Sequence, residues 1–112
     1  MVDPPVQTKK DLLSAIRRHP HKIKTFGVKR LGLFGSFVRN QQSAGSDIDL
    51  LVEFEEGQKT FNNFIQLSFW LEEILSWSVE LVTVEAISPY LRSYITQEVE
   101  YVTLLNGEPW QE

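Results

Sequence analysis

Two short motifs of this chain, separated by ten residues, carry side chains that could bind a phosphorylated ligand. The first is the dipeptide Gly35-Ser36, in which glycine lets backbone N–H groups approach a phosphate closely and serine adds a hydroxyl donor. The second contains Asp47 and Asp49 ahead of the apolar run 50–52, and because strand side chains alternate, both aspartates project from one face. Close carboxylates repel each other unless a proton or a cation lies between them, and a divalent metal is the usual cation in an all-oxygen site. The two motifs together predict a site for a metal ion and a triphosphate.

A third carboxylate is expected on a neighbouring strand. Transfer of a phosphoryl or nucleotidyl group requires charge neutralisation, commonly by two metal ions about 3.5–4 Å apart. Glu80 is the natural candidate, since it is the lone charge in the apolar segment 79–82. Glu85 is a weaker candidate, because it has the opposite strand parity and lies at the end of its segment. We therefore predict that Asp47, Asp49 and Glu80 are the catalytic and metal-binding residues.

Apolar periodicity and capping residues predict the elements that must position these motifs. The expected elements are helices over 8–19, 60–75 and 88–97, a short helical or irregular stretch at 22–26, and strands over 28–34, 47–54, 79–84 and 101–105. Strand 47–54 should be central in the sheet, because it is too apolar for an edge. The order of elements predicts an α+β fold, in which a small mixed sheet has helices packed on one face.

Length and composition limit the functions that the chain can have by itself. Its 112 residues are enough for one domain, which we place at residues 1–105 with a C-terminal tail at 106–112. The chain has no cysteine and no apolar run near the roughly 20 residues of a membrane helix, and residues 1–5 lack the basic and apolar regions of a signal peptide. We therefore expect a cytoplasmic protein that does not associate with membranes. Any second, large substrate would have to be bound mainly by another protein.

Charge is distributed unevenly along the chain. Nine of the eleven Lys and Arg residues lie in residues 1–40, whereas thirteen of the fifteen Asp and Glu residues lie in 41–112. The basic N-terminal part could face phosphates or an acidic partner, or it could be an ordinary solvated helix surface. With a net charge of −4, the whole chain is not expected to bind nucleic acid autonomously.

The motifs and their surroundings resemble the minimal nucleotidyltransferases of the DNA polymerase beta superfamily, of the MntA type that act as antitoxins paired with HEPN ribonucleases. The resemblance covers roughly residues 28–84 and rests on three segments in the same order and spacing. They are Gly-Ser-Phe-Val-Arg at 35–39, Ser-Asp-Ile-Asp-Leu-Leu-Val-Glu-Phe at 46–54 and Val-Glu-Leu-Val at 79–82. A Gly-Ser pair alone is a weak signal, but its spacing from Asp-x-Asp on an apolar strand is specific.

The resemblance implies a palm-like fold with ATP as the nucleotide donor. It also implies two Mg²⁺ ions held by Asp47, Asp49 and Glu80. The residues implied to bind the nucleotide lie in the first two segments and are Gly35, Ser36, Arg39 and Ser46.

The implied acceptor is a tyrosine of a cognate HEPN toxin, which would be inactivated by transfer of AMP. Two alternatives stay open at this point. The chain could instead be a weak or inactive module that neutralises the toxin by occlusion, or the catalytic subunit of a small-molecule nucleotidyltransferase.

Two positions depart from the family's pattern. Glu80 stands where aspartate is usual, and the extra methylene moves the carboxylate by about 1.5 Å. Displacements on that scale can lower a catalytic rate by orders of magnitude. Asn40 stands where a glycine often follows the arginine, and it is expected to stiffen the loop.

Overall fold

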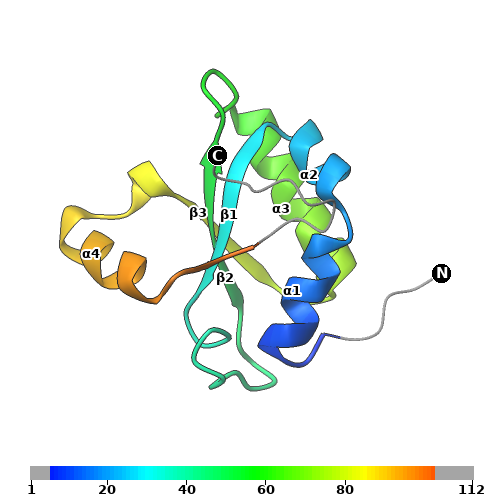
Figure 1. Cartoon of the computed structure of the whole chain (residues 1–112), viewed down its shortest axis with the longest axis vertical. Coiled ribbons are helices and arrows are strands. Elements are labelled where there is room, and N and C mark those ends of the chain that lie inside the picture. Colours follow the sequence, from blue (N-terminus) through cyan, green and yellow to red (C-terminus); the bar gives the residue numbers. More distant parts are fainter. Residues whose placement is uncertain (1–5, 103–112) are drawn as a thin grey trace.

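A four-stranded mixed sheet forms the centre of the computed structural model, which describes residues 6–102 (Figure 1). The elements in chain order are α1 (Lys9–Arg17), α2 (Pro20–Thr25), β1 (Val28–Phe34), β2 (Ile48–Phe54), α3 (Phe61–Leu75), β3 (Val79–Thr83), the 3₁₀ helix η1 (Val84–Ala86), α4 (Pro89–Glu98) and β4 (Glu100–Tyr101). The α+β class and the order of elements are therefore confirmed. The predicted tail at 106–112 and the last part of the predicted strand 101–105 lie outside the described residues.

The first two helices differ from the prediction in how they meet. Thr8 caps α1 as expected, since its side chain accepts a hydrogen bond from the backbone N–H of Asp11. Pro20, which directly follows the first predicted helix, occupies the first turn of α2, where its missing N–H costs nothing. The segment predicted as helical or irregular at 22–26 is therefore the rest of a regular short helix and its C-cap residue, Phe26.

The sheet has the strand order β3-β2-β1-β4, so β2 is central, as its apolar sequence predicts. Strands β1 and β2 are antiparallel, whereas β2 and β3 are parallel and are connected by α3. This connection brings the start of β3 beside the start of β2. In the resulting register, Asp49 is the partner of Phe34 on one side and of Glu80 on the other.

Helices α1, α2 and α3 cover one face of the sheet (Figure 1). The apolar stripe of α3 packs on the strand side chains of that face, with Leu67, Leu71 and Leu75 buried. Thr60 caps α3 at its start, and Ser76 ends it in a left-handed conformation. The side-chain period of two thus separates an apolar core on this face from the residues that β1, β2 and β3 present on the other.

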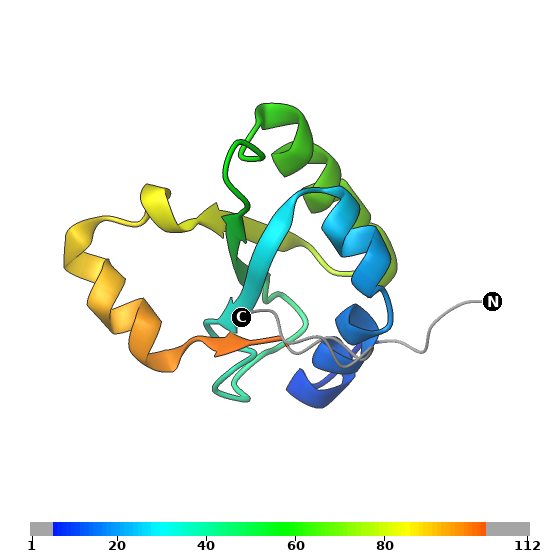
Figure 2. The same cartoon turned by 45° about the horizontal axis from the view of Figure 1, so that its top comes forward.

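Helix α4 lies on the opposite side of the sheet from α1, α2 and α3, as Figure 1 and Figure 2 show, so the prediction that the helices pack on one face is wrong for α4. It begins at the expected Ser88-Pro89 pair, where the Ser88 side chain accepts a hydrogen bond from the N–H of Leu91. None of its residues is fully buried, so α4 spans the open face of the sheet without forming a second core. Within residues 6–102, no helix has both the length and the apolar character needed to cross a membrane.

Candidate functional site

Three acidic side chains lie close together on the open face of the sheet. Asp49 in β2 and Glu80 in β3 are register partners, and side chains of paired residues project from the same face. Asp47 immediately precedes β2 and is exposed, as is Glu80, whereas Asp49 is half-buried. The structure therefore brings together the acids that the sequence predicts. Glu85 lies apart in η1, where its carboxylate is 3.5 Å from Nζ of Lys59.

The pKa of Asp49 records the electrostatics of this cluster. Burial, followed by the negative charges of Glu80 and Asp47, raises the pKa of Asp49 to about 6, while the Arg39 guanidinium opposes the shift. A carboxylate ionises less readily where desolvation and neighbouring anions are not balanced by a cation. The site therefore carries more negative charge than its own groups neutralise.

Gly35 is required for the close approach of its turn to Asp49. Its φ of 82° lies in the left-handed region, which residues with a side chain rarely adopt. In addition, a Cβ atom at Gly35 would collide with Oδ2 of Asp49 and lie 2.9 Å from its Cγ. Glycine is needed here for its conformation and for its lack of a side chain, so the first motif and the second form one site.

The turn that follows Gly35 is held by its own backbone. The N–H groups of Val38 and Arg39 donate to the carbonyl of Gly35, and the N–H of Gln41 donates to the carbonyl of Ser36. Phe37 is fully buried and packs edge-to-face on Trp77, with ring centroids 5.0 Å apart. This aromatic anchor fixes the turn that carries half-buried Ser36 and exposed Arg39.

Glu98, in the last turn of α4, completes this arrangement, and sequence reasoning missed it. Its Oε2 accepts a hydrogen bond from the N–H of Gly35 at 2.8 Å, and its Oε1 accepts one from Nη1 of Arg39 at 2.8 Å. The Nε atom of Arg39 donates to the side chain of Gln41. Nothing in the spacing along the chain signals this contact, because Gly35 and Glu98 are 63 positions apart in the sequence. They meet only because α4 lies on the open face of the sheet.

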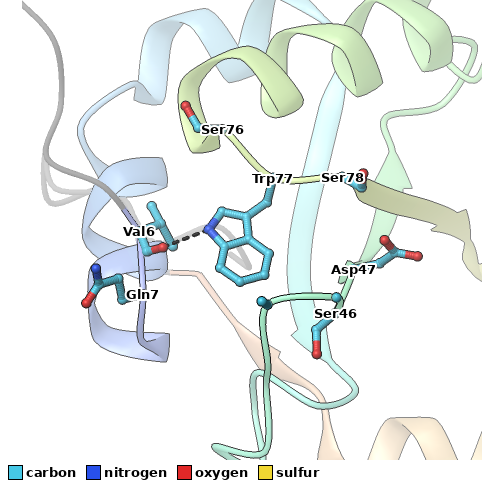
Figure 3. Close-up of a pocket in the computed structure, with 9 residues that line it drawn as sticks. Val6, Gln7, Ser46, Asp47, Ser76, Trp77 and Ser78 are labelled. Carbon is cyan, nitrogen blue, oxygen red and sulfur yellow. Dashed lines mark hydrogen bonds between the residues drawn. The ribbon is translucent and has the colours of Figure 1, made fainter.

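Two surface cavities border the acids. A cavity of about 420 Å³ lies between the sheet and α4, and its walls include Asp49, Glu80 and Leu91. A second cavity, of about 610 Å³, lies beside α1 and the loop before β2, as Figure 3 shows. The indole of Trp77 forms part of its wall, and the carboxylate of Asp47 points away from that ring (Figure 3).

Ser46, which is also predicted to bind nucleotide, lines the second cavity. Its Oγ accepts a hydrogen bond from the N–H of Ser43 at 2.8 Å, which fixes the loop that leads into β2. Glu98 thus links Gly35 and Arg39 by hydrogen bonds, whereas Ser46 lies in the loop that precedes Asp47.

The donor set suits a hard divalent cation, since it consists of carboxylate oxygens only. Among residues 6–102, no three Asp, Glu, His or Cys side chains already stand in coordinating positions. The uncompensated negative charge around Asp49 is nevertheless what a cation would neutralise, so the residues present fit a Mg²⁺ site.

Comparison with known proteins identifies the family. The sequence profile described as "nucleotidyltransferase domain" matches residues 16–102. This range includes both motifs and Glu80, together with strands β1, β2 and β3. The chain belongs to the nucleotidyltransferase family. Among relatives of this nucleotidyltransferase, protein adenylyltransferase MntA of Thermococcus cleftensis is 34% identical over 96 residues, which cover 85% of this chain and 96% of the relative. A Methanocaldococcus jannaschii protein, MJ1379, named as a candidate protein adenylyltransferase, is 35% identical over 100 residues, which cover 87% of this chain and all of the relative.

Solved structures have the same fold as this nucleotidyltransferase. A candidate minimal nucleotidyltransferase superposes with a TM-score of 0.65 at 32% identity, covering 79% of this chain and 93% of the other. A toxin–antitoxin structure with AMP-PNP has a TM-score of 0.62 at 19% identity and covers 88% of this chain and 74% of the other. A Shewanella oneidensis complex of a tri-AMPylated HEPN toxin with an MNT antitoxin has a TM-score of 0.59 at 18% identity, covering 88% and 75%. At such identities the last two support the fold alone.

Proposed function

We propose that this nucleotidyltransferase transfers AMP from ATP, in the presence of Mg²⁺, to a tyrosine hydroxyl of a HEPN-type toxin and so acts as its antitoxin. The observation that carries the proposal is the pairing of Asp49 with Glu80 beside the turn at Gly35, in a chain of this family. The relative named protein adenylyltransferase MntA supports the choice of a protein acceptor.

The proposed roles follow from the chemistry of each group. The N–H of Gly35, the hydroxyl of Ser36 and the guanidinium of Arg39 are donors that would bind the triphosphate. Asp47 and Asp49, with Glu80 completing the set, would hold Mg²⁺, which supplies charge neutralisation at the phosphates when bound.

In the reaction, the acceptor oxygen forms a bond to the α-phosphorus as the bond between that phosphorus and the pyrophosphate oxygen breaks. The hydroxyl proton passes to a carboxylate of the acidic cluster. Pyrophosphate leaves along the turn at residues 35–39, where Arg39 offsets its charge.

A protein acceptor is consistent with what the chain exposes. The described residues form a single sheet with its helices and contain no further domain to bind an acceptor. Exposed aromatic side chains occur on two helices, and they are Phe61 and Phe69 of α3 and Tyr90 and Tyr94 of α4. Large exposed aromatic groups of this kind are typical of surfaces that a partner covers.

The direct test is transfer of label from ATP labelled at the α-phosphate to the HEPN protein encoded by the adjacent gene, with Mg²⁺ present. The wild-type protein should label its partner. Asp49→Asn should lower the rate by at least about 10²-fold, whereas Glu53→Gln, a carboxylate change on the same strand outside the cluster, should keep it. A wild-type protein that binds its partner but transfers no label would refute the proposal.

Occlusion of the toxin is the second candidate, and the exposed aromatic residues of α3 and α4 favour it. It predicts that a variant lacking the acids still silences the toxin on co-expression. If Asp49→Asn forms the complex with the toxin but no longer protects the cell, binding alone is not the mechanism.

A further inference from the structure

The Glu98 carboxylate bonds the two groups that a phosphate would use. The N–H of Gly35 and Nη1 of Arg39 both donate to it at 2.8 Å, each to a different oxygen. This bidentate geometry is the one in which such donors bind an anion. The Glu98 side chain is only 19% exposed, so it lies within the site and not on its rim.

A carboxylate and a triphosphate cannot both bind the N–H of Gly35. The Gly35 N–H has a single hydrogen to donate, and a phosphate placed near Glu98 would face a like charge in a partly desolvated site. Like charges placed together at a binding surface weaken binding. Glu98 must therefore leave the donors before a phosphate can bind them.

The attachment of α4 makes this exchange structurally feasible. None of the residues of α4 is fully buried, and Glu98 lies in its last turn, just before the two-residue strand β4. Moving the Glu98 side chain breaks two hydrogen bonds but opens no apolar core. Most of the energy of the contact therefore resides in the charge-assisted bonds, which a phosphate can replace.

We propose that Glu98 is an internal anion that binds the triphosphate donors of the nucleotide-free protein, and that it sets nucleotide affinity by having to be displaced. This inference rests on the proposed function for the identity of the nucleotide. The hydrogen bonds from Gly35 and Arg39 to Glu98 are observed in the structure and do not depend on that function.

The test is a calorimetric titration of the full chain with inorganic tripolyphosphate in the absence of metal, and separately with ATP and Mg²⁺. Glu98→Gln keeps the size of the side chain and removes its charge, and Glu98→Ala removes both acceptor oxygens. Both variants should bind tripolyphosphate at least about tenfold more tightly than the wild type. Glu100→Gln, which changes an exposed acid two residues away that pairs with Lys9, should bind as the wild type does.

A purely structural role for Glu98 predicts the opposite result, because loss of its bonds would loosen the turn and weaken binding. Unchanged or weaker tripolyphosphate binding by both Glu98 variants overturns the inference, as does a lack of tripolyphosphate binding by every variant. Tighter tripolyphosphate binding without any binding of ATP and Mg²⁺ would support the role of Glu98 while refuting the proposed function. Equal binding of ATP and Mg²⁺ by all variants, with tripolyphosphate affinity also unchanged, would overturn the role of Glu98 and leave the proposed function standing.

Discussion

Replacing Gly35 by alanine tests whether the turn and the carboxylate of Asp49 form a single site. The φ of 82° at Gly35 makes alanine unfavourable by about 1–2 kcal/mol from backbone conformation alone. The new Cβ would also collide with Oδ2 of Asp49, and forcing extra atoms into a filled space costs about 1–3 kcal/mol. We expect Gly35→Ala to lower the free energy of unfolding by about 2–5 kcal/mol.

Gly57 provides a matched control for the backbone contribution. Its φ is 80°, almost the same as that of Gly35, but a Cβ added there would meet nothing within 4 Å. Gly57→Ala should therefore lower the free energy of unfolding by only about 1–2 kcal/mol. The difference between the two variants, measured by urea denaturation, isolates the collision with Asp49.

The same pair of variants separates stability from activity. Relief of the collision requires the Asp49 carboxylate to move by about 1 Å, and a displacement of that size can lower the rate of AMP transfer by about 10²-fold. Gly57→Ala should transfer AMP at the wild-type rate under conditions in which it is folded. Combining Gly35→Ala with Asp49→Ala should recover part of the lost stability, because the group that Cβ meets is gone. Equal unfolding free energies for the two glycine variants, with no recovery in the double variant, would refute the reasoning.

Three further changes test other parts of the site. At Asn40, whose φ is 57°, valine should lower the free energy of unfolding by about 1–2 kcal/mol in urea denaturation, whereas glycine should change it by less than about 0.5 kcal/mol. The pKa of Asp49 is raised to about 6 in the folded protein, so the folded protein holds this proton more tightly than the unfolded chain does. The stabilisation that protonated Asp49 provides is therefore complete at pH 3.8 and below and is lost as the pH rises through 6. Asp49→Asn should therefore be more stable than the wild type at pH 8, by about 1–2 kcal/mol after allowance for solvent screening, but not at pH 3.5, as thermal melts would show. Glu80→Gln should lower the initial rate of AMP transfer by about 10²-fold relative to the wild type, because the charge is lost.

The fold was largely predictable because its strands and longest helix have clear apolar periods. The central position of β2 followed from its apolar run, and α3 follows Thr60, its N-cap, at the expected position. The side of the sheet on which α4 lies was not predictable, since none of its residues is fully buried and its sequence carries no strong apolar stripe. Pro20 shows a second limit, because proline is equally suited to following one helix and to beginning the next.

The acids of the site were predictable for a geometric reason. Strand parity placed Asp47 and Asp49 on one face, and Glu80 was expected on a neighbouring strand as the lone charge of an apolar segment. The parallel register of β2 and β3, which pairs Asp49 with Glu80, comes from the structure. Asn40 is also explained by the structure, because its left-handed φ is a conformation that glycine adopts freely and asparagine tolerates. Glu98 was not predictable, since its role depends on where α4 lies and not on any local pattern.

The uneven charge of the chain is partly balanced by ion pairs between its two parts. Lysines and arginines of the basic N-terminal part pair with acids of the C-terminal part, and examples are Lys9 with Glu100, Arg30 with Glu53 and Arg39 with Glu98. The first two pairs are partly exposed and lie away from the acidic cluster, where such bridges contribute little, about 0–1 kcal/mol. The Arg39 pair differs because its acid also bonds the N–H of Gly35, which lies beside Asp49. An anion that replaces Glu98 there would recover the same donors, so this ion pair can be exchanged for a ligand without loss of hydrogen bonds at the turn.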